Sequence, residues 1–237
     1  FTNGYGGGVY WDGFQAEFLT GPGDFGNETC LSYLVDSVHD GLDIIYKKAQ
    51  KHNKNAKLTW RSVIDIPTKI MKSAKQEYVV LGCAPSLNIY GTTPINVGEP
   101  AKLPIRFAGC HLHFGMSEKG EVKEQRAKKI IEMVDATFGI ASVCLFHDME
   151  DHRRRRYYGR AGEYRLPKWG VEYRTPSSAM LAHPVLFHLS VELTRFGYFL
   201  AKFPRPKDVW EYDPLAVKDI INSYDTAGAK KILKANE

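Results

Sequence analysis

The sequence predicts an α+β fold in which an antiparallel β-sheet is covered by helices on one face. Short strand-like segments are separated by one or two helical segments at uneven intervals, without a regular βα alternation. Several of the predicted strands alternate polar and apolar residues, as strands do when one face of the sheet is buried. Long segments with apolar residues at helical spacing supply the helices that would cover the apolar face.

The first elements follow from local patterns. Apolar residues recur at every second position across 9–19, which predicts β structure with a turn at Asp12-Gly13. Asn27 is a typical helix N-cap, and apolar residues at helical spacing predict a helix from about 28 to 51. The remaining predictions for the first half are strands over 57–67 and 77–83 and a short helix over 66–74.

The second half begins with a predicted long loop over 84–104, because this segment contains four prolines. Loops of this length often serve as lids or binding segments. An arginine-rich loop is predicted near 150–165. The other predicted elements are strands over 105–115 and 170–177, helices over 123–146 and about 183–203, and two short helices in a tail over 207–237.

The composition is that of a soluble globular protein, with 43% apolar and 25% charged residues in 237. The formal net charge of +5 favours an anionic partner without separating a nucleotide from a nucleic acid. The four cysteines lack CxxC spacing, which argues against a zinc ribbon or a redox pair. No apolar run is long enough to span a bilayer, and no signal peptide is visible.

Three predicted strands each present polar side chains on one face. Side chains two residues apart on a strand share a face, so His111 and His113 point the same way. The same spacing pairs Glu172 with Arg174, and it pairs Gln15 with Glu17. We therefore expect a sheet with a polar working face and an apolar face packed against helices.

The residue types on this face suit phosphate chemistry. Carboxylates and imidazoles can hold a divalent cation, and a nitrogen ligand is tolerated best by Mn²⁺ or Zn²⁺. Arg160, Arg165 and Arg174 offer bidentate forks for phosphate or carboxylate oxygens, and Gly159 and Gly162 allow close approach of a ligand. A metal ion together with arginines is typical of phosphoryl transfer, where catalysis depends mostly on positioning and charge neutralisation. The chain has no P-loop, so a nucleotide would bind on the open sheet.

Each motif alone has an ordinary structural explanation. A histidine pair can belong to the core, a Glu-x-Arg pair can be a surface ion pair, and the four arginines 153–156 can form a solvated loop. We interpret the six remaining histidines as structural. The co-occurrence of the motifs in one chain favours the functional interpretation.

Five stretches together carry a family resemblance. They are "WDGFQAEFLTGP", "VLGCAPSLNIYG", "AGCHLHFG", "RRYYGRAGEYR" and "GVEYRTPS". In this order they resemble the phage-type carboxylate–amine ligases (COOH-NH2 ligase type 2) of the glutamine synthetase and glutamate–cysteine ligase superfamily. The resemblance covers roughly residues 9–200, and the ordered set is more specific than any single motif.

The resemblance implies a curved antiparallel sheet with helices on one face, within a ligase-like catalytic domain over 1–205 followed by a helical tail over 206–237. It implies that ATP phosphorylates a carboxylate and that an amine then displaces phosphate to form an amide or isopeptide bond. It also implies two or three Mg²⁺ or Mn²⁺ ions and a set of site residues. Glu17 and Glu172 would bind metal. His111 would be a metal ligand or an ATP-phosphate contact, and His113 the other. Arg160, Arg165 and Arg174 would hold the transferring phosphoryl group or the acyl substrate, with Arg156 as a weaker candidate for the same role and for contact with ATP.

The sequence departs from the superfamily pattern in one respect that matters for the site. The superfamily places a further acidic cluster on a strand before the position of Glu17, and this sequence starts at Phe1. Either that strand has been cut away, or the chain lacks one metal site. Cys110 also stands where related sequences commonly carry glycine. The loop over 84–104 is the candidate lid that would keep water from an acyl phosphate.

Three other functions remain open at the level of sequence. They are a metal-dependent hydrolase built on His111 and His113, a phage structural or binding protein that retains the fold without activity, and a nucleic-acid-binding protein acting through 153–156. For the ligase we expect a small-molecule or peptide carboxylate and an amine as partners. We expect no membrane partner, do not favour nucleic acid, and leave a homo-oligomer open. The expected location is the cytoplasm, that of the host if the chain is phage-encoded.

Overall fold

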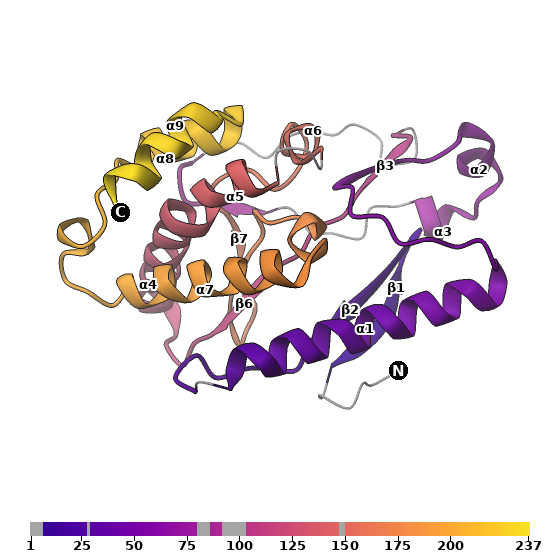
Figure 1. Cartoon of the computed structure of the whole chain (residues 1–237), viewed down its shortest axis with the longest axis horizontal. Coiled ribbons are helices and arrows are strands. Elements are labelled where there is room, and N and C mark those ends of the chain that lie inside the picture. Colours follow the sequence, from indigo (N-terminus) through magenta and orange to yellow (C-terminus); the bar gives the residue numbers. More distant parts are fainter. Residues whose placement is uncertain (1–6, 28, 80–85, 92–102, 147–149) are drawn as a thin grey trace. The chain divides into compact units, whose positions relative to one another are not determined.

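The computed structural model of the chain describes residues 7–27, 29–79, 86–91, 103–146 and 150–237 (Figure 1). It confirms a mixed α+β architecture of small antiparallel sheets and helices. The chain divides into two compact units, which are described separately. The first comprises 1–60, 65–83 and 98–106, and the second comprises 61–64, 84–97 and 107–237. The predicted boundary between residues 205 and 206 stays a prediction.

The first unit contains the predicted β-hairpin and the long helix beside it (Figure 1). Strands β1 (Gly8–Asp12) and β2 (Gln15–Leu19) pair antiparallel, and Gly13 in the turn has φ 58°, which favours glycine. Helix α1 (Cys30–His52) packs on β2, where the absence of a side chain at Gly41 admits the ring of Phe18. The helix begins at Cys30 with Thr29 as its N-cap, so the prediction of Asn27 as the N-cap is wrong. The Asn27 side chain instead accepts the backbone N–H of Thr29 at 2.9 Å in the turn before the helix.

Two short helices follow in the same unit. Helix α2 (Thr68–Ser73) confirms the predicted short helix. Helix α3 (Gln76–Val79) shows that the strand predicted over 77–83 is wrong for 77–79, and 80–83 lie outside the described residues. The carbonyl of Val79 accepts a hydrogen bond from the buried Arg106 guanidinium at 2.8 Å. This tertiary contact stabilises a helical turn at 76–79, where β propensity alone predicts a strand.

Strands β3 (Val63–Asp65) and β5 (Ile105–Phe107) form a two-stranded sheet. Strand β3 is much shorter than the predicted strand over 57–67. The predicted strand over 105–115 is also interrupted, because 108–111 leave the ladder. Gly109 forms an isolated bridge with Ser177, and the backbone N–H of Ala108 donates to the carbonyl of Ser62 at 2.9 Å.

The second unit is built around a four-stranded antiparallel sheet. Its strands are β4 (Leu87–Asn88), β7 (Glu163–Arg165), β8 (Gly170–Tyr173) and β6 (Leu112–Gly115), in that spatial order. Strand β4 lies within the predicted long loop. Residues 84, 85 and 92–102 of that loop are outside the described part of the chain, so the lid stays a prediction.

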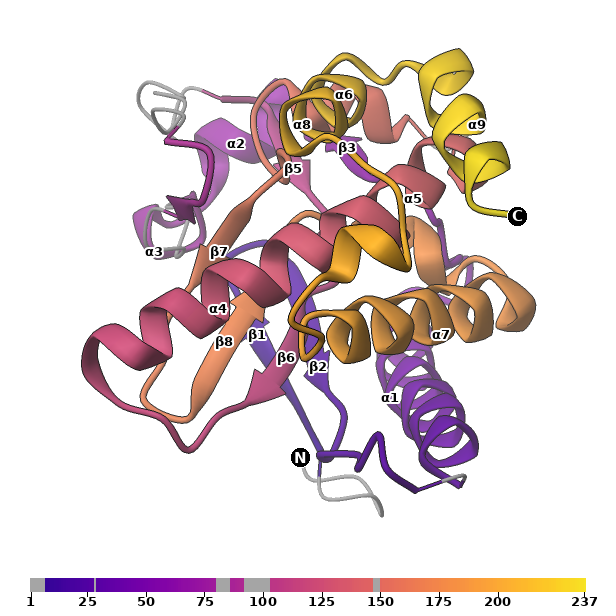
Figure 2. The same ribbon diagram turned by 90° about the vertical axis from the view of Figure 1, so that its left-hand side faces the viewer.

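Helices cover one face of this sheet (Figure 2). The predicted helix over 123–146 is continuous but changes type: α4 (Gly120–Val134) leads into the π-helical η2 (Asp135–Gly139) and then α5 (Ile140–Leu145). The 3-10 turn η4 (Ser178–Leu181) precedes α7 (Pro184–Leu200). Phe114 of β6 stacks on Tyr198 of α7 with ring centroids 5.5 Å apart. The apolar face predicted for the sheet is confirmed by this packing and by the burial of Val171 and Tyr173.

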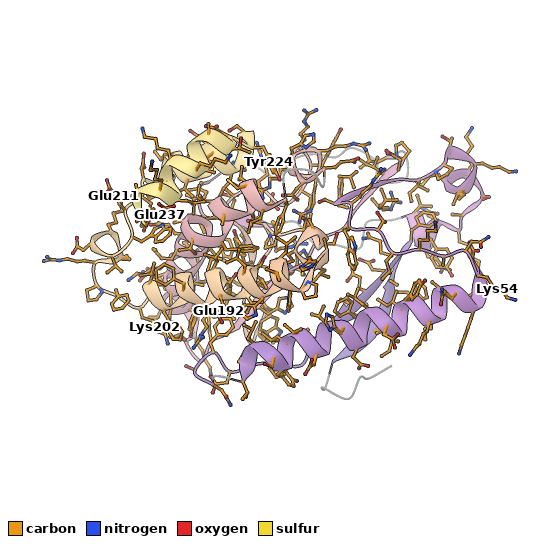
Figure 3. The ribbon with its side chains drawn as sticks, in the orientation of Figure 1. Lys54, Glu192, Lys202, Glu211, Tyr224 and Glu237 are labelled. Carbon is orange, nitrogen blue, oxygen red and sulfur yellow. The ribbon has the colours of Figure 1, made fainter. Side chains whose placement is uncertain are left out.

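The chain ends in the two short helices predicted after 207. A 3-10 turn, η5 (Pro206–Asp208), is followed by α8 (Pro214–Ser223) and α9 (Thr226–Ala235). Helix α9 packs on α5, and its end is fixed where Asn236 exchanges hydrogen bonds with the backbone of Glu211 (Figure 3). Among the described residues, no helix is both long enough and apolar enough to cross a membrane.

Candidate active site

The polar face of the four-stranded sheet carries a row of three polar side chains. His113 of β6 lies directly opposite Glu172 of β8, and Glu172 lies directly opposite Arg165 of β7. Opposed residues in an antiparallel ladder point to the same face, so imidazole, carboxylate and guanidinium stand side by side. The structure confirms a polar face for β6, β7 and β8. The expectation that the strand with Gln15 and Glu17 belongs to the same sheet is wrong, because β2 pairs with β1 in a separate two-stranded sheet.

Glu172 is the centre of this row and is only 3% exposed. Arg165 binds it bidentately, with Nε 2.7 Å from Oε2 and Nη2 2.8 Å from Oε1. The His111 Nδ1 atom lies 2.8 Å from Oε1. Burial alone would raise the pKa of the Glu172 carboxyl, but hydrogen bonds from His111 and Arg165 outweigh it and hold that pKa below its usual range. Glu172 is therefore a fixed anion at neutral pH.

His111 lies just before β6 and reaches the same carboxylate. Its Nε2 atom is 2.7 Å from the hydroxyl of Tyr158, so both ring nitrogens are hydrogen-bonded. Burial lowers the pKa of His111 to about 4, although the hydrogen bond with Glu172 opposes this shift. The neutral ring therefore donates Nδ1–H to Glu172 and accepts the Tyr158 hydroxyl proton at Nε2.

His111, His113 and Glu172 could together hold a metal ion. One ligand atom from each lies within 4.8 Å of the others. Two imidazole nitrogens and one carboxylate oxygen suit a divalent ion such as Mn²⁺ or Zn²⁺, and the carboxylate suits Mg²⁺. The structure thus brings Glu172 together with both histidines, of which the resemblance implied one as a metal ligand and the other as an ATP-phosphate contact.

The third predicted metal ligand, Glu17, lies on β2 opposite Tyr10 in the first unit. The triad of His111, His113 and Glu172 lies in the second unit. The role of Glu17 as a metal ligand stays a prediction.

Trp169 borders the triad. Its indole is 48% exposed and stacks on His113 with ring centroids 4.9 Å apart. The turn that carries it is braced by Lys123 of α4, which donates to the carbonyls of Pro167 and Lys168. Sequence patterns did not single out Trp169, because a lone tryptophan in a turn has no motif.

The predicted phosphate-binding arginines differ in their surroundings. Arg174 is fully buried, with Nη1 2.9 Å from the Ser86 hydroxyl and Nε 3.5 Å from Glu172 Oε1. Arg160 lies in a loop between Gly159 and Gly162, which have φ 76° and 75°. Its buried Nε atom has no hydrogen-bond partner among the described residues. Arg156 is exposed at the end of α6 (Asp151–Arg155).

Helix α6 corrects the prediction that the four consecutive arginines form a solvated loop. Arg154 is buried and donates to the carbonyls of Arg174, Thr175 and Pro176, and this clamp fixes the chain after β8. Arg155 is buried as well and binds Asp151, Ser142 and the carbonyl of Ile221. Of the four consecutive arginines, Arg153 and Arg156 remain accessible to a nucleic-acid backbone. This weakens the hypothesis that the run binds nucleic acid. Burying Arg155 beside Tyr224 also ties α6 to the segment between α8 and α9 (Figure 3).

A buried acid supports the sheet from behind. Asp135, the first residue of the π-helical segment, accepts a hydrogen bond from the hydroxyl of Tyr173 on β8 at 2.5 Å. Burial raises the pKa of Asp135 to about 7, against the opposing effect of this hydrogen bond. Because Tyr173 directly follows Glu172, this contact helps to fix β8. The one signal in the sequence was an aspartate inside a largely apolar stretch of helix.

Comparisons with known proteins point to one family. No curated protein and no solved structure shows a significant match to the chain. The sequence model of the phage phiEco32-like COOH.NH2 ligase-type 2 family matches residues 102–192, the segment that carries His111, His113, Arg165, Glu172 and Arg174. The resemblance to this ligase family, predicted from the motifs, is therefore confirmed over residues 102–192.

Proposed function

We propose that the chain is an ATP-dependent carboxylate–amine ligase that forms an amide or isopeptide bond through an acyl phosphate. The observation that carries the proposal is the row of His113, Glu172 and Arg165 on one sheet face, extended by His111 and Arg174. This face combines a metal-ligand set with fixed cationic forks. The family match over 102–192 supports the ligase class, and a glutamine synthetase-like fold is part of the same proposal.

The ligand set fits a divalent ion. The three donor atoms of His111, His113 and Glu172 lie within 4.8 Å of one another, and Glu172 stays ionised because of its hydrogen bonds. A carboxylate has about four lone-pair sites, so Glu172 can accept from Arg165 and still bind a cation. When bound, Mg²⁺ or Mn²⁺ would neutralise charge on the phosphate oxygens.

The arginines of this chain would position the transferring group. Arg165 and Arg174 flank Glu172, and Arg160 has a buried donor that no described residue satisfies. In the first step a carboxylate oxygen of the substrate attacks the γ-phosphorus of ATP, and ADP leaves. In the second step the amine nitrogen attacks the acyl carbon, the bond from carbon to the phosphate oxygen breaks, and the amine loses a proton. Fixed forks would bind the phosphoryl oxygens in both steps without reorganising.

Nucleotide binding is the first test of this proposal. A non-hydrolysable ATP analogue is titrated calorimetrically into the chain with and without Mg²⁺, and into Glu172→Ala and His111→Ala. His188→Ala is the matched control, because His188 is exposed on α7 and outside the site. We expect metal-dependent binding that both site variants lose and the control retains. Equal binding by all four proteins, or none by the wild type, would overturn the proposal.

The reaction itself can be tested without knowing the amine. Hydroxylamine intercepts acyl phosphates as hydroxamates, so ATP, Mg²⁺, hydroxylamine and a panel of carboxylates form a screen. We expect hydroxamate and ADP in equal amounts with at least one carboxylate. ADP and phosphate formed at the same rate without any carboxylate would indicate a simple ATPase instead.

A further inference from the structure

Tyr158 contacts His111 on the far side of the ring from Glu172. Its hydroxyl is 2.7 Å from Nε2, whereas Nδ1 faces the Glu172 carboxylate at 2.8 Å. The nitrogen beside Glu172 is the one that could share an ion with that carboxylate. Nε2 is then the outer nitrogen, whose partner orients the ring and fixes its tautomer.

The position of Tyr158 is itself well determined. The guanidinium carbons of Arg154 and Arg174 each lie 4.9 Å from the centroid of its ring. Both arginines are fully buried, and Arg154 is tied to three consecutive carbonyls after β8. The Tyr158 ring is therefore held in part by Arg154, whose hydrogen bonds to three carbonyls do not involve His111.

A hydroxyl is suited to this place for a chemical reason. With no cation bound, His111 carries its proton on Nδ1 and accepts from Tyr158 at Nε2. A cation at Nδ1 requires the proton on Nε2, which must then donate. A tyrosine hydroxyl both donates and accepts, so it can bond to either tautomer, whereas a carbonyl oxygen serves only one.

We propose that Tyr158 is a positioning residue for the metal ligand His111, and that its hydroxyl stabilises the imidazole in both the ligand-free and the cation-bound tautomer. The inference rests on the proposed function, because it assumes that His111 binds a divalent cation there. It assigns to Tyr158 no contact with substrate or ATP.

The neighbouring Tyr157 offers a matched control. It is more exposed, and its ring stacks on Phe107 with centroids 5.6 Å apart. Tyr158→Phe and Tyr157→Phe each delete one hydroxyl and keep the ring. Only the first removes a contact with His111.

The test is Mn²⁺ binding to the full chain, measured by calorimetry and by the loss of the free-ion electron spin resonance signal. We expect Tyr158→Phe to weaken Mn²⁺ binding by roughly 10- to 100-fold, the usual effect of losing a partner behind a metal ligand. Tyr157→Phe should match the wild type, and His111→Ala should abolish binding. Thermal unfolding of the two phenylalanine variants establishes that both are folded.

The tautomer of His111 provides a second measurement, which would not change if Tyr158 served only the stability of the fold. Two-bond ¹H–¹⁵N spectra of the imidazoles report which nitrogen of His111 carries the proton, with Mg²⁺ as a diamagnetic probe. We expect the proton to move from Nδ1 to Nε2 when Mg²⁺ is added to the wild type, and Tyr158→Phe to need a higher Mg²⁺ concentration for the same change.

The outcomes separate the two proposals. If the wild type binds Mn²⁺ and His111→Ala does not, but Tyr158→Phe binds as tightly as Tyr157→Phe, only the role of Tyr158 is refuted. If the wild type binds no Mn²⁺, the proposed metal site fails and the role of Tyr158 fails with it.

Discussion

The guanidinium of Arg165 faces the carboxylate of Glu172 across the β7–β8 ladder and donates to both of its oxygens, at 2.7 and 2.8 Å. The same carboxylate lies 3.5 Å from the fully buried Arg174. One anion therefore compensates the charges of two arginines on this face. The stability of the sheet and the chemistry of the site depend on the same group.

Replacing Glu172 by glutamine keeps the size of the side chain and removes its charge. The buried Arg174 then faces a neutral amide, and we expect the free energy of unfolding to fall by about 3 kcal/mol. Arg165 is 36% exposed, so water compensates part of its loss. Urea unfolding at pH 7 measures the effect. Glu118→Gln is the control, because its ion pair with Arg126 lies at the surface; equal losses in the two variants would contradict the prediction.

The buried imidazole of His111 should make the protein less stable in mild acid. Its pKa of about 4 in the folded chain is below the ordinary value of about 6.5, so the unfolded chain binds the proton first. This contribution to stability is complete above about pH 6.5 and is lost as the pH falls toward 4. Urea unfolding between pH 5 and 7 should give a shallower pH dependence for His111→Gln than for the wild type. Parallel curves for the two proteins would refute this.

Asp135 should show the opposite dependence. Its folded pKa of about 7 is above the ordinary value of about 3.9, so its contribution is complete below about pH 3.9 and is lost as the pH rises through 7. We expect Asp135→Asn to gain stability relative to the wild type as the pH rises from 4 to 8, by at most about 1.4 kcal/mol per unit. Asp219→Asn, on the exposed side of α8, should show no such trend.

Gly159 tests the clamp formed by Arg154. A Cβ atom there would lie 2.0 Å from Arg154 Nη1, and the residue has φ 76°. Gly91 has a similar φ of 68°, but a Cβ atom there would meet nothing within 4 Å. Both alanine variants carry the same backbone strain, so we expect Gly159→Ala to cost about 1–3 kcal/mol more in free energy of unfolding than Gly91→Ala. Equal costs would mean that Arg154 adapts without loss.

The polar face could be predicted because strand periodicity is short-range and strict. The two-residue spacing predicted that His111 and His113 share a face, and the structure brings both imidazoles near Glu172, although His111 lies just before β6. The partner strands and their register could not be predicted in this way, because they depend on contacts distant in sequence. The site residues also came from the family resemblance, which the match over 102–192 confirms in part.

The sequence led to a wrong prediction at the arginine run, where two of the charged side chains are buried. A run of four arginines suggests a solvated segment, but Arg154 and Arg155 are held inside by carbonyls of residues 174–176 and 221. The only local sign was Asp151, which stands one helical turn before Arg155. The π-helical segment at Asp135 has no sequence signature, because it depends on tertiary packing around Tyr173.

The two contacts of Glu172 with Arg165 and His111 differ in their separation along the sequence. Arg165 and Glu172 belong to adjacent strands of one hairpin, and only seven positions separate them. His111 meets Glu172 across 61 positions, after the helices α4 to α6 have been inserted between them. Short loops close faster than long ones, so we expect the guanidinium of Arg165 to reach the Glu172 carboxylate earlier in folding than the imidazole of His111 does.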